Sequence, residues 1–321
     1  MSVLVLSEHD VRELLDMESC IEAMTEVLAS LARGELYQPL RSVARPPDAP
    51  GFIGLMPAHR GGATPAYALK EIVVTPDNPT RGLDAHQGAV LLHDGETGQL
   101  AAVMNASPVT EIRTAAVSAV ATRALARPGA ERVAILGAGV QARAHVDAMR
   151  AVLDDPEIRV WSRRMETAEE LAGSIGAIVA PSVDSALFGA DVVCTATSAK
   201  EPIVEHRWLT RGAHVNAVGA FGAARELDSE TIASAALFVD RRESALNEGG
   251  DYGIAAAEGA VGPEHIKAEL GDVLAGMSRG RESEDELTVF KSYGIGVEDL
   301  AVAELVVRRA RQRGVGVEVD F

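Results

Sequence analysis

Between residues 132 and 240 the chain alternates between short apolar runs and segments with helical periodicity. The runs, made mostly of Val, Ile and Ala, occupy residues 133–136, 158–161, 177–180, 191–197, 214–219 and 237–240. A continuous apolar run is typical of a strand buried on both faces, and a helix between two such strands makes them parallel. The pattern therefore predicts an α/β domain of the Rossmann type, with a doubly wound parallel sheet.

Residues 1–105 have a different pattern. A helical periodicity extends over 10–33, and a stretch rich in proline and turn-forming residues follows it. Two strand-like segments then occupy 67–74 and 88–93. Helices and strands that do not alternate regularly predict an α+β domain distinct from the parallel one.

Two long helices are predicted outside the parallel sheet. Ser107 followed by Pro108 is typical of an N-cap with proline at the first helical position, and this bridging helix is expected to end at about residue 126. Apolar residues recur at helical spacing over 297–314, which predicts a C-terminal helix that packs back on the first domain. The expected domains are 1–116 with 300–321, and 117–299.

Composition and charge narrow the possible functions. The 321 residues, 47% hydrophobic and 24% charged, are typical of a globular protein with two domains. The net charge of −17, without any run of Lys or Arg, argues against nucleic acid and membrane surfaces as partners. We expect neither a secretory signal nor a membrane span, and we expect Cys20 and Cys194 to be buried free thiols. These features predict a cytoplasmic protein.

A glycine-rich turn follows the first apolar run. The segment RVAILGAGVQARAHVDAM places a buried strand before Gly137-x-Gly139-x-x-Ala142 and a helix directly after it. The first glycine permits a tight turn, and the second lets the backbone approach a pyrophosphate that the free amides of the helix bind. The motif alone is weak, but in this strand–turn–helix context it predicts dinucleotide binding.

The end of the second predicted strand bears on the choice of dinucleotide. NAD-binding domains usually have an acidic residue there, which accepts hydrogen bonds from the adenosine ribose. In this chain Trp161 is followed by Ser162, Arg163 and Arg164. Arginine binds phosphate through two hydrogen bonds, whereas a carboxylate repels it. We therefore predict a preference for NADP(H), with NAD(H) as the alternative if the arginines form only a solvated loop.

Lysine is rare in this chain, and one lysine has an unusual setting. The lysines are Lys70, Lys200, Lys267 and Lys291. Lys70 lies in an apolar strand-like run, where loss of solvent lowers the pKa of an ammonium group. We predict that it donates a proton or binds substrate, the alternative being a strand-end lysine that extends into solvent.

Two arginines are candidates for binding a substrate carboxylate. Arg113 lies in the bridging helix at the domain boundary, where a cleft is expected, and Arg41 lies in a proline-flanked loop. The alternative for each is an ordinary surface arginine. His59 and His86 have no partner at a spacing typical of a metal site, so no metal is expected.

Four segments in order along the chain resemble the ornithine cyclodeaminase and mu-crystallin family. They are ASPVTEIRTAAVSAVATRALA, ILGAGVQARAHVDAM, VNAVGAF with RELD, and TVFKSYGIGVEDLA. The family contains ornithine and lysine cyclodeaminases, alanine dehydrogenases, ketimine and pyrroline-carboxylate reductases and the NADPH-binding mu-crystallin. The resemblance implies a Rossmann domain, a substrate-binding and dimerisation domain of the α+β class, and a homodimer formed through the latter.

The resemblance also implies roles for individual residues. Arg41, Lys70 and Arg113 match the family's substrate-binding residues, with Lys70 and Arg113 as catalytic candidates. Together with the turn and the strand ends, the expected cofactor contacts are Arg113, Thr114, Gly137, Ala138, Gly139, Val140, Gln141, Ser162, Arg163, Arg164, Thr197, Val218 and Ser292.

Two departures from the family pattern bear on the reaction. The resemblance implies that cyclodeaminases have an acidic residue at the position of Gly54 in this chain. It also implies that they have a catalytic aspartate in the loop that here reads Gly219-Ala220-Phe221-Gly222. We therefore expect an oxidoreductase that reduces the C=N bond of a small cyclic or acyclic imino acid, or acts as an alanine dehydrogenase. The alternatives are a cyclodeaminase-type ammonia lyase and a non-catalytic NADPH-binding protein.

Overall fold

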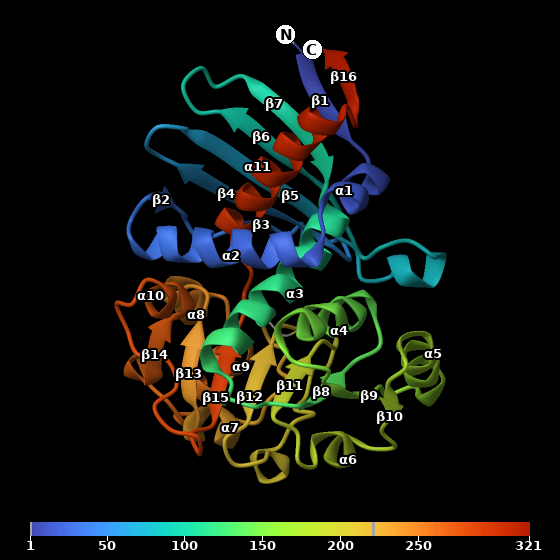
Figure 1. Cartoon of the computed structure of the whole chain (residues 1–321), viewed down its shortest axis with the longest axis vertical. Coiled ribbons are helices and arrows are strands. Elements are labelled where there is room, and N and C mark those ends of the chain that lie inside the picture. Colours follow the sequence, from blue (N-terminus) through green and yellow to red (C-terminus); the bar gives the residue numbers. More distant parts are fainter. Residues whose placement is uncertain (1, 220–221) are drawn as a thin grey trace. The chain divides into compact units, whose positions relative to one another are not determined.

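The computed structural model describes residues 2–219 and 222–321. The chain forms two compact units, one comprising Met1–Arg113 with Gly294–Phe321 and the other Thr114–Tyr293. These are the first and the second unit (Figure 1).

The second unit is built on a parallel sheet. Its strands are β8 (Arg132–Leu136), β9 (Glu157–Trp161), β10 (Ile178–Val179), β11 (Val192–Thr195), β12 (His214–Ala217), β13 (Ala236–Val239), β14 (Ile266–Glu269) and β15 (Thr288–Lys291). Their order is β10-β9-β8-β11-β12-β15-β13-β14, and all neighbouring pairs are parallel. The first five strands have the order of a Rossmann sheet, with the chain reversing direction across the sheet between β8 and β11. The predicted fold is confirmed.

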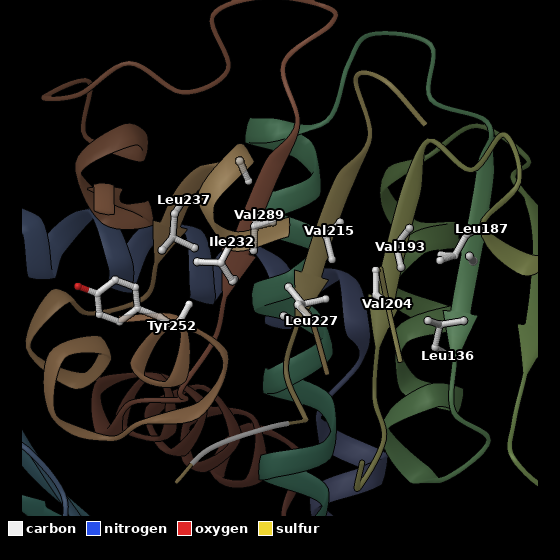
Figure 2. Packing of buried hydrophobic residues seen from close by; sticks show 14 of the residues in the cluster. Leu136, Leu187, Val193, Val204, Val215, Leu227, Ile232, Leu237, Tyr252 and Val289 are labelled. Carbon is white, nitrogen blue, oxygen red and sulfur yellow. The ribbon is translucent and has the colours of Figure 1, made fainter. Parts of the chain in front are cut away.

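Helices connect these parallel strands. They are α4 (Val140–Val152), α5 (Met165–Ile175), α6 (Val183–Leu187), α7 (Ser229–Ser234), α8 (Arg242–Asn247), α9 (Gly250–Ala257) and α10 (Leu270–Leu274), with 3-10 turns at His206–Trp208 and Pro263–His265. Figure 2 shows Val193, Val215, Val289 and Leu237 side by side on consecutive strands. All four side chains are fully buried, so this row forms the centre of the core on one face of the sheet.

The first unit contains a mixed sheet. Its strands are β1 (Ser2–Leu6), β2 (Leu36–Tyr37), β3 (Ser42–Ala44), β4 (Phe52–Arg60), β5 (Ala66–Val74), β6 (His86–Asp94), β7 (Leu100–Asn105) and β16 (Val317–Asp320). The order is β16-β1-β7-β6-β5-β4-β2, with β3 also paired to β4. Its helices are α1 (Glu8–Leu14), α2 (Met17–Ala32) and α11 (Gly296–Arg313), with a 3-10 turn at Asn78–Arg81. The long α11 packs on β4, β5, β6 and α2, as predicted for the C-terminal helix (Figure 1).

Two helix boundaries differ from the predicted ones. The segment 10–33 is not one helix, because the chain leaves the helix at Leu15 and Asp16 then caps α2 by accepting a hydrogen bond from the Ser19 amide at 2.8 Å. The bridging helix is α3 (Ala106–Leu125) and starts before the predicted Ser107. Its cap is the Asn105 side chain, which accepts a hydrogen bond from the Ser107 amide at 2.9 Å.

Cys20 and Cys194 are buried free thiols, as predicted. Among the described residues, no helix combines the length and the apolar character needed to cross a membrane.

Candidate functional site

The two glycines of the turn between β8 and α4 have different structural roles. Gly137 has a φ of +126°, and a Cβ atom there would lie 2.4 Å from the Ala196 carbonyl oxygen. The fold itself therefore requires glycine at this position. Gly139 has φ −86° and ψ −168°, which any residue adopts, and a Cβ atom there would meet nothing within 4 Å. Its glycine is not required by packing within the chain.

Gly139 instead leaves the N-terminus of α4 open. It is the N-cap of this helix and provides no side-chain hydrogen bond to the first amides. Free amides and the positive end of the helix dipole form an anion site, and the missing Cβ lets a bulky anion approach the backbone. These features fit the pyrophosphate of a dinucleotide.

The turn opens into a cleft of 1040 Å³, slightly larger than the usual ligand pocket of about 300–1,000 Å³. Most of the residues predicted to contact the cofactor line it, namely Gly137, Ala138, Gly139, Val140, Gln141, Ser162, Arg163, Arg164 and Thr197. Segments from β8, β9 and β11 therefore meet at the carboxyl edge of the sheet, where ligands of doubly wound folds bind.

The end of β9 supplies the positive charge of this cleft. Arg163 and Arg164 follow Trp161 and Ser162, line the cleft and are exposed. Within residues 2–219 and 222–321 neither guanidinium group forms an ion pair with a carboxylate. The Ser162 hydroxyl lies 3.0 Å from the Thr167 hydroxyl. Two unneutralised guanidinium groups beside a hydroxyl suit an anionic group on the ligand.

The remaining predicted cofactor residues do not line this cleft. Val218 follows β12, and its amide donates to the Thr195 carbonyl at 3.2 Å. Ser292 is 3% exposed, and its hydroxyl donates to Asp240 at 3.2 Å. Thr114 is buried in α3, and Arg113 belongs to the other unit. Cofactor contact by these four residues stays a prediction.

In the first unit, Lys70 is buried rather than extended into solvent. It lies on β5 with 1% of its surface exposed, and its Nζ donates to Asp299 at 2.9 Å. Its Nζ also lies 3.5 Å from the Thr110 hydroxyl. Burial lowers the pKa of Lys70 to about 8, an effect that Arg113 reinforces and Asp299 opposes. This pKa allows Lys70 to release a proton near neutral pH.

Arg113 belongs to the same charged cluster. Its Nη1 donates to Glu298 at 2.8 Å, and its Nε lies 3.4 Å from Asp299. Both carboxylates are fully buried in the first turn of α11, where the positive end of the helix dipole stabilises them. The cluster thus links β5, α3 and α11 through charged hydrogen bonds.

Arg41 completes the cluster from the segment that precedes β3. Its Nη2 donates to the Gly294 carbonyl at 2.6 Å, next to α11. Three cationic side chains, Lys70, Arg113 and Arg41, thus stand with two carboxylates, Glu298 and Asp299. Two guanidinium groups and an ammonium group so placed suit a small substrate with a carboxylate group.

The two buried acids of this cluster are not among the residues predicted from the sequence. Glu298 and Asp299 lie in the apolar segment GIGVEDLA, and adjacent acidic residues within such a segment were the signal that could have identified them. Another buried acid, Glu226 in the segment RELD, was also missed. Gly54, the first of the two departures from the cyclodeaminase pattern inferred from the sequence, lies on β4. Ala220 and Phe221 of the second departure lie outside the described residues.

No group of three or more metal-ligating side chains is found in the part of the chain that the structure describes. His86 lies at the start of β6 and is exposed; partial desolvation of its ring and then the charge of Lys70 lower its pKa.

The chain has relatives along almost its whole length. Residues 1–314 match the ornithine cyclodeaminase/mu-crystallin family. The ketimine reductase mu-crystallin of Mus musculus is 40% identical over 308 residues, which cover 94% of this chain and 95% of that protein.

Solved structures give the same result. The Thermococcus litoralis Delta(1)-pyrroline-2-carboxylate reductase in complex with NADH and L-proline has a TM-score of 0.94 and 37% identity, covering 99% of this chain and 100% of that chain. An archaeal alanine dehydrogenase dimer with bound NAD has a TM-score of 0.94 and 32% identity, covering 100% of both chains. As its sequence motifs predict, this chain belongs to the ornithine cyclodeaminase/mu-crystallin family.

Proposed function

We propose that this chain is an NAD(P)-dependent oxidoreductase of the imine reductase and alanine dehydrogenase type, which reduces the C=N bond of a small cyclic or acyclic imino acid. The observation that carries the proposal is the cluster around the buried Lys70, because it brings one lysine and two arginines together beside α11, and burial lowers the pKa of the lysine. The relatives support the proposal. One is a ketimine reductase, one is a pyrroline-2-carboxylate reductase with bound NADH, and one is an alanine dehydrogenase with bound NAD.

The residues of the first unit bind and orient the substrate. Arg41 and Arg113 hold its carboxylate, and Lys70 donates a proton or a hydrogen bond to its nitrogen or carbonyl group. The nicotinamide ring, when bound in the second unit, supplies the hydride. We assign substrate binding and dimerisation to the first unit, close to the expected residues 1–116 with 300–321, and dinucleotide binding to the second unit, close to the expected residues 117–299.

A substrate screen tests this function. NADPH and NADH oxidation is measured with cyclic imino acids, and with 2-oxo acids supplied together with ammonia or methylamine. We expect net cofactor consumption with at least one imine. Release of ammonia from L-ornithine without net cofactor consumption would instead identify a lyase, and cofactor binding without turnover of any substrate would identify a binding protein.

We further propose a preference for NADP(H), with Arg163 and Arg164 binding the ribose phosphate. Replacing both by Ala is expected to remove the preference, because each charge-assisted hydrogen bond to phosphate contributes about 1.5–3 kcal/mol. Dissociation constants of NADPH and NADH, measured by calorimetry for the unmodified and the double variant, test this. Arg143→Ala, an exposed arginine of α4 that does not line the cleft, is the matched control. Equal affinity of the unmodified protein for both cofactors contradicts the proposal.

We also propose a homodimer formed through the sheet of the first unit. An apolar row crosses this sheet in register from Pro57 through Leu69, Leu91 and Val103 to Val5. These side chains are half-buried or exposed, and they alternate with the buried face on which Lys70 meets α11. An apolar sheet face of this kind is typical of an interface between subunits. The related archaeal alanine dehydrogenase is a dimer.

Leu91→Glu is expected to convert the dimer into a monomer, because it places a carboxylate at the centre of the apolar row. Light scattering coupled to gel filtration measures the mass. Phe188→Glu, at an exposed position of the second unit, is the control and should leave the mass unchanged. A dimer that persists in Leu91→Glu places the interface elsewhere.

A further inference from the structure

A buried carboxylate joins two strand ends beside the proposed cofactor cleft. Glu226 is fully buried and follows β12. Its Oε1 accepts hydrogen bonds from the amide and the hydroxyl of Thr197, both at 2.7 Å. Its Oε2 accepts from the Thr195 hydroxyl at 2.7 Å and from the Gly219 amide at 2.9 Å. One side chain thus binds the segments that follow β11 and β12.

The backbone around this carboxylate leaves no room for other side chains. A Cβ atom on Gly219 would lie 2.4 Å from the Thr197 carbonyl oxygen and 2.7 Å from both oxygens of Glu226. On the other side, a Cβ atom on Gly137 would lie 2.4 Å from the Ala196 carbonyl oxygen. The segments after β8, β11 and β12 are therefore in direct contact, and a shift of one displaces the next.

Glu226 is itself held by other buried charges. Asp251 of α9 accepts hydrogen bonds from the amides of Glu226 and Leu227, at 2.7 and 2.8 Å. Lys291 of β15 lies 3.2 Å from Asp251. Burial, and then the charge of Asp251, raise the pKa of Glu226, whereas Lys291 and the two threonines oppose this rise. Two backbone amides directed at its two oxygens nevertheless favour the ionised carboxylate.

The position of Glu226 relates it to one half of the cofactor site. A Rossmann sheet consists of two mononucleotide-binding halves that meet where the strand order reverses, which here is between β8 and β11. The half that contains β9 has the arginines assigned above to the adenosine ribose. Thr197, which lines the cleft, belongs to the other half. That half corresponds to the nicotinamide mononucleotide.

We propose that Glu226 is a positioning residue for the nicotinamide half of the cofactor site, because its carboxylate fixes Thr197 and Gly219 at the ends of β11 and β12. The proposal rests on the dinucleotide binding proposed above. Glu226 itself has no contact with solvent, so it acts through these two segments and does not replace the missing cyclodeaminase aspartate.

Glu226→Gln tests the proposal, because the amide group keeps the size of the side chain but can accept through one oxygen only. Calorimetry measures the affinity for NADH and for AMP, which lacks the nicotinamide half. We expect the dissociation constant of NADH to rise about tenfold to a hundredfold, as for the loss of one hydrogen bond to a charged group. The dissociation constant of AMP is expected to stay within about twofold, a difference that general destabilisation does not produce.

Two further variants separate positioning from folding. Thr195→Val removes one of the four donors to Glu226 from a buried position that does not line the cleft, so a smaller loss of NADH affinity is expected. Asp191→Asn is the matched control, because Asp191 binds the amides of Glu131 and Arg132 at the opposite end of β11, both at 2.9 Å. It should lower the melting temperature and leave NADH affinity unchanged.

Each outcome decides between the alternatives. Unchanged NADH affinity in Glu226→Gln, or equal losses for NADH and AMP, overturns the positioning role. If Glu226→Gln does not fold, unchanged NADH affinity in Thr195→Val overturns it. If the unmodified protein binds AMP and NADH with equal affinity or binds neither, the proposed dinucleotide function fails instead.

Discussion

Replacing Lys70 by methionine is expected to lower turnover of the best imine substrate by about a hundredfold to ten-thousandfold, the usual effect of losing a catalytic proton or hydrogen-bond donor. Methionine fills a similar volume in the buried position on β5 but cannot donate. The affinity for NADPH should hardly change, because the residues that line the dinucleotide cleft all belong to the second unit. Steady-state kinetics and calorimetry measure the two quantities.

The ion pair with Asp299 determines how this variant affects stability. From the sequence alone, loss of a desolvated ammonium is expected to leave stability unchanged or to raise it. Lys70 donates to Asp299 at 2.9 Å, so removing the ammonium group takes a cationic hydrogen-bond donor from a buried carboxylate. The free energy of unfolding is therefore expected to fall. The double variant Lys70→Met/Asp299→Asn should recover stability without recovering turnover. Turnover of the single variant within a few-fold of the unmodified enzyme contradicts a catalytic role for Lys70.

The pH profile gives a second measurement on the same group. Because the pKa of Lys70 is lowered to about 8, a donor role requires kcat/KM to be constant at lower pH and to fall as the pH rises through about 8. The residual activity of Lys70→Met should lack this fall.

Most strands of the second unit are predicted from the sequence, because the residues of each strand identify it without reference to distant segments. Strands such as β8 and β11 are buried along almost their whole length and consist mostly of apolar residues, so each is recognisable without its neighbours. β14 and β15 were not predicted. β15 lies between β12 and β13 although it follows both in the chain, and its ends include Thr288 and Lys291. A strand with polar ends that is inserted from a distant segment has no comparable local pattern.

Individual residues of the candidate site could be proposed from the sequence, but their ion-pair and hydrogen-bond partners could not. Lys70 was identified because an ammonium group in an apolar run is unusual. Its partner Asp299 is 229 positions away, and only the packing of α11 on β5 brings the two together. Similarly, Gly137 and Gly139 are recognisable as a motif, but the hydrogen bonds of Glu226 to Thr197 depend on the order of the strands.

Gly139→Val is expected to abolish dinucleotide binding while leaving the second unit folded. The backbone at Gly139 is extended, and its Cβ position is open, so valine fits the protein with only the cost of about 1 kcal/mol for a poor helix cap. The new side chain would occupy the space through which a pyrophosphate approaches the amides of α4. Loss of two or more charge-assisted hydrogen bonds corresponds to at least about a hundredfold in affinity.

Gly137→Ala is the matched comparison within the same turn, and unlike Gly139→Val it should destabilise the second unit. A Cβ atom at Gly137 would collide with the Ala196 carbonyl oxygen, and the positive φ is strained for alanine. Its melting temperature should therefore fall, whereas that of Gly139→Val should stay close to that of the unmodified protein. Calorimetric titration with NADH and NADPH, together with thermal unfolding, measures both effects. Native dinucleotide affinity in a folded Gly139→Val protein places the cofactor away from the N-terminus of α4.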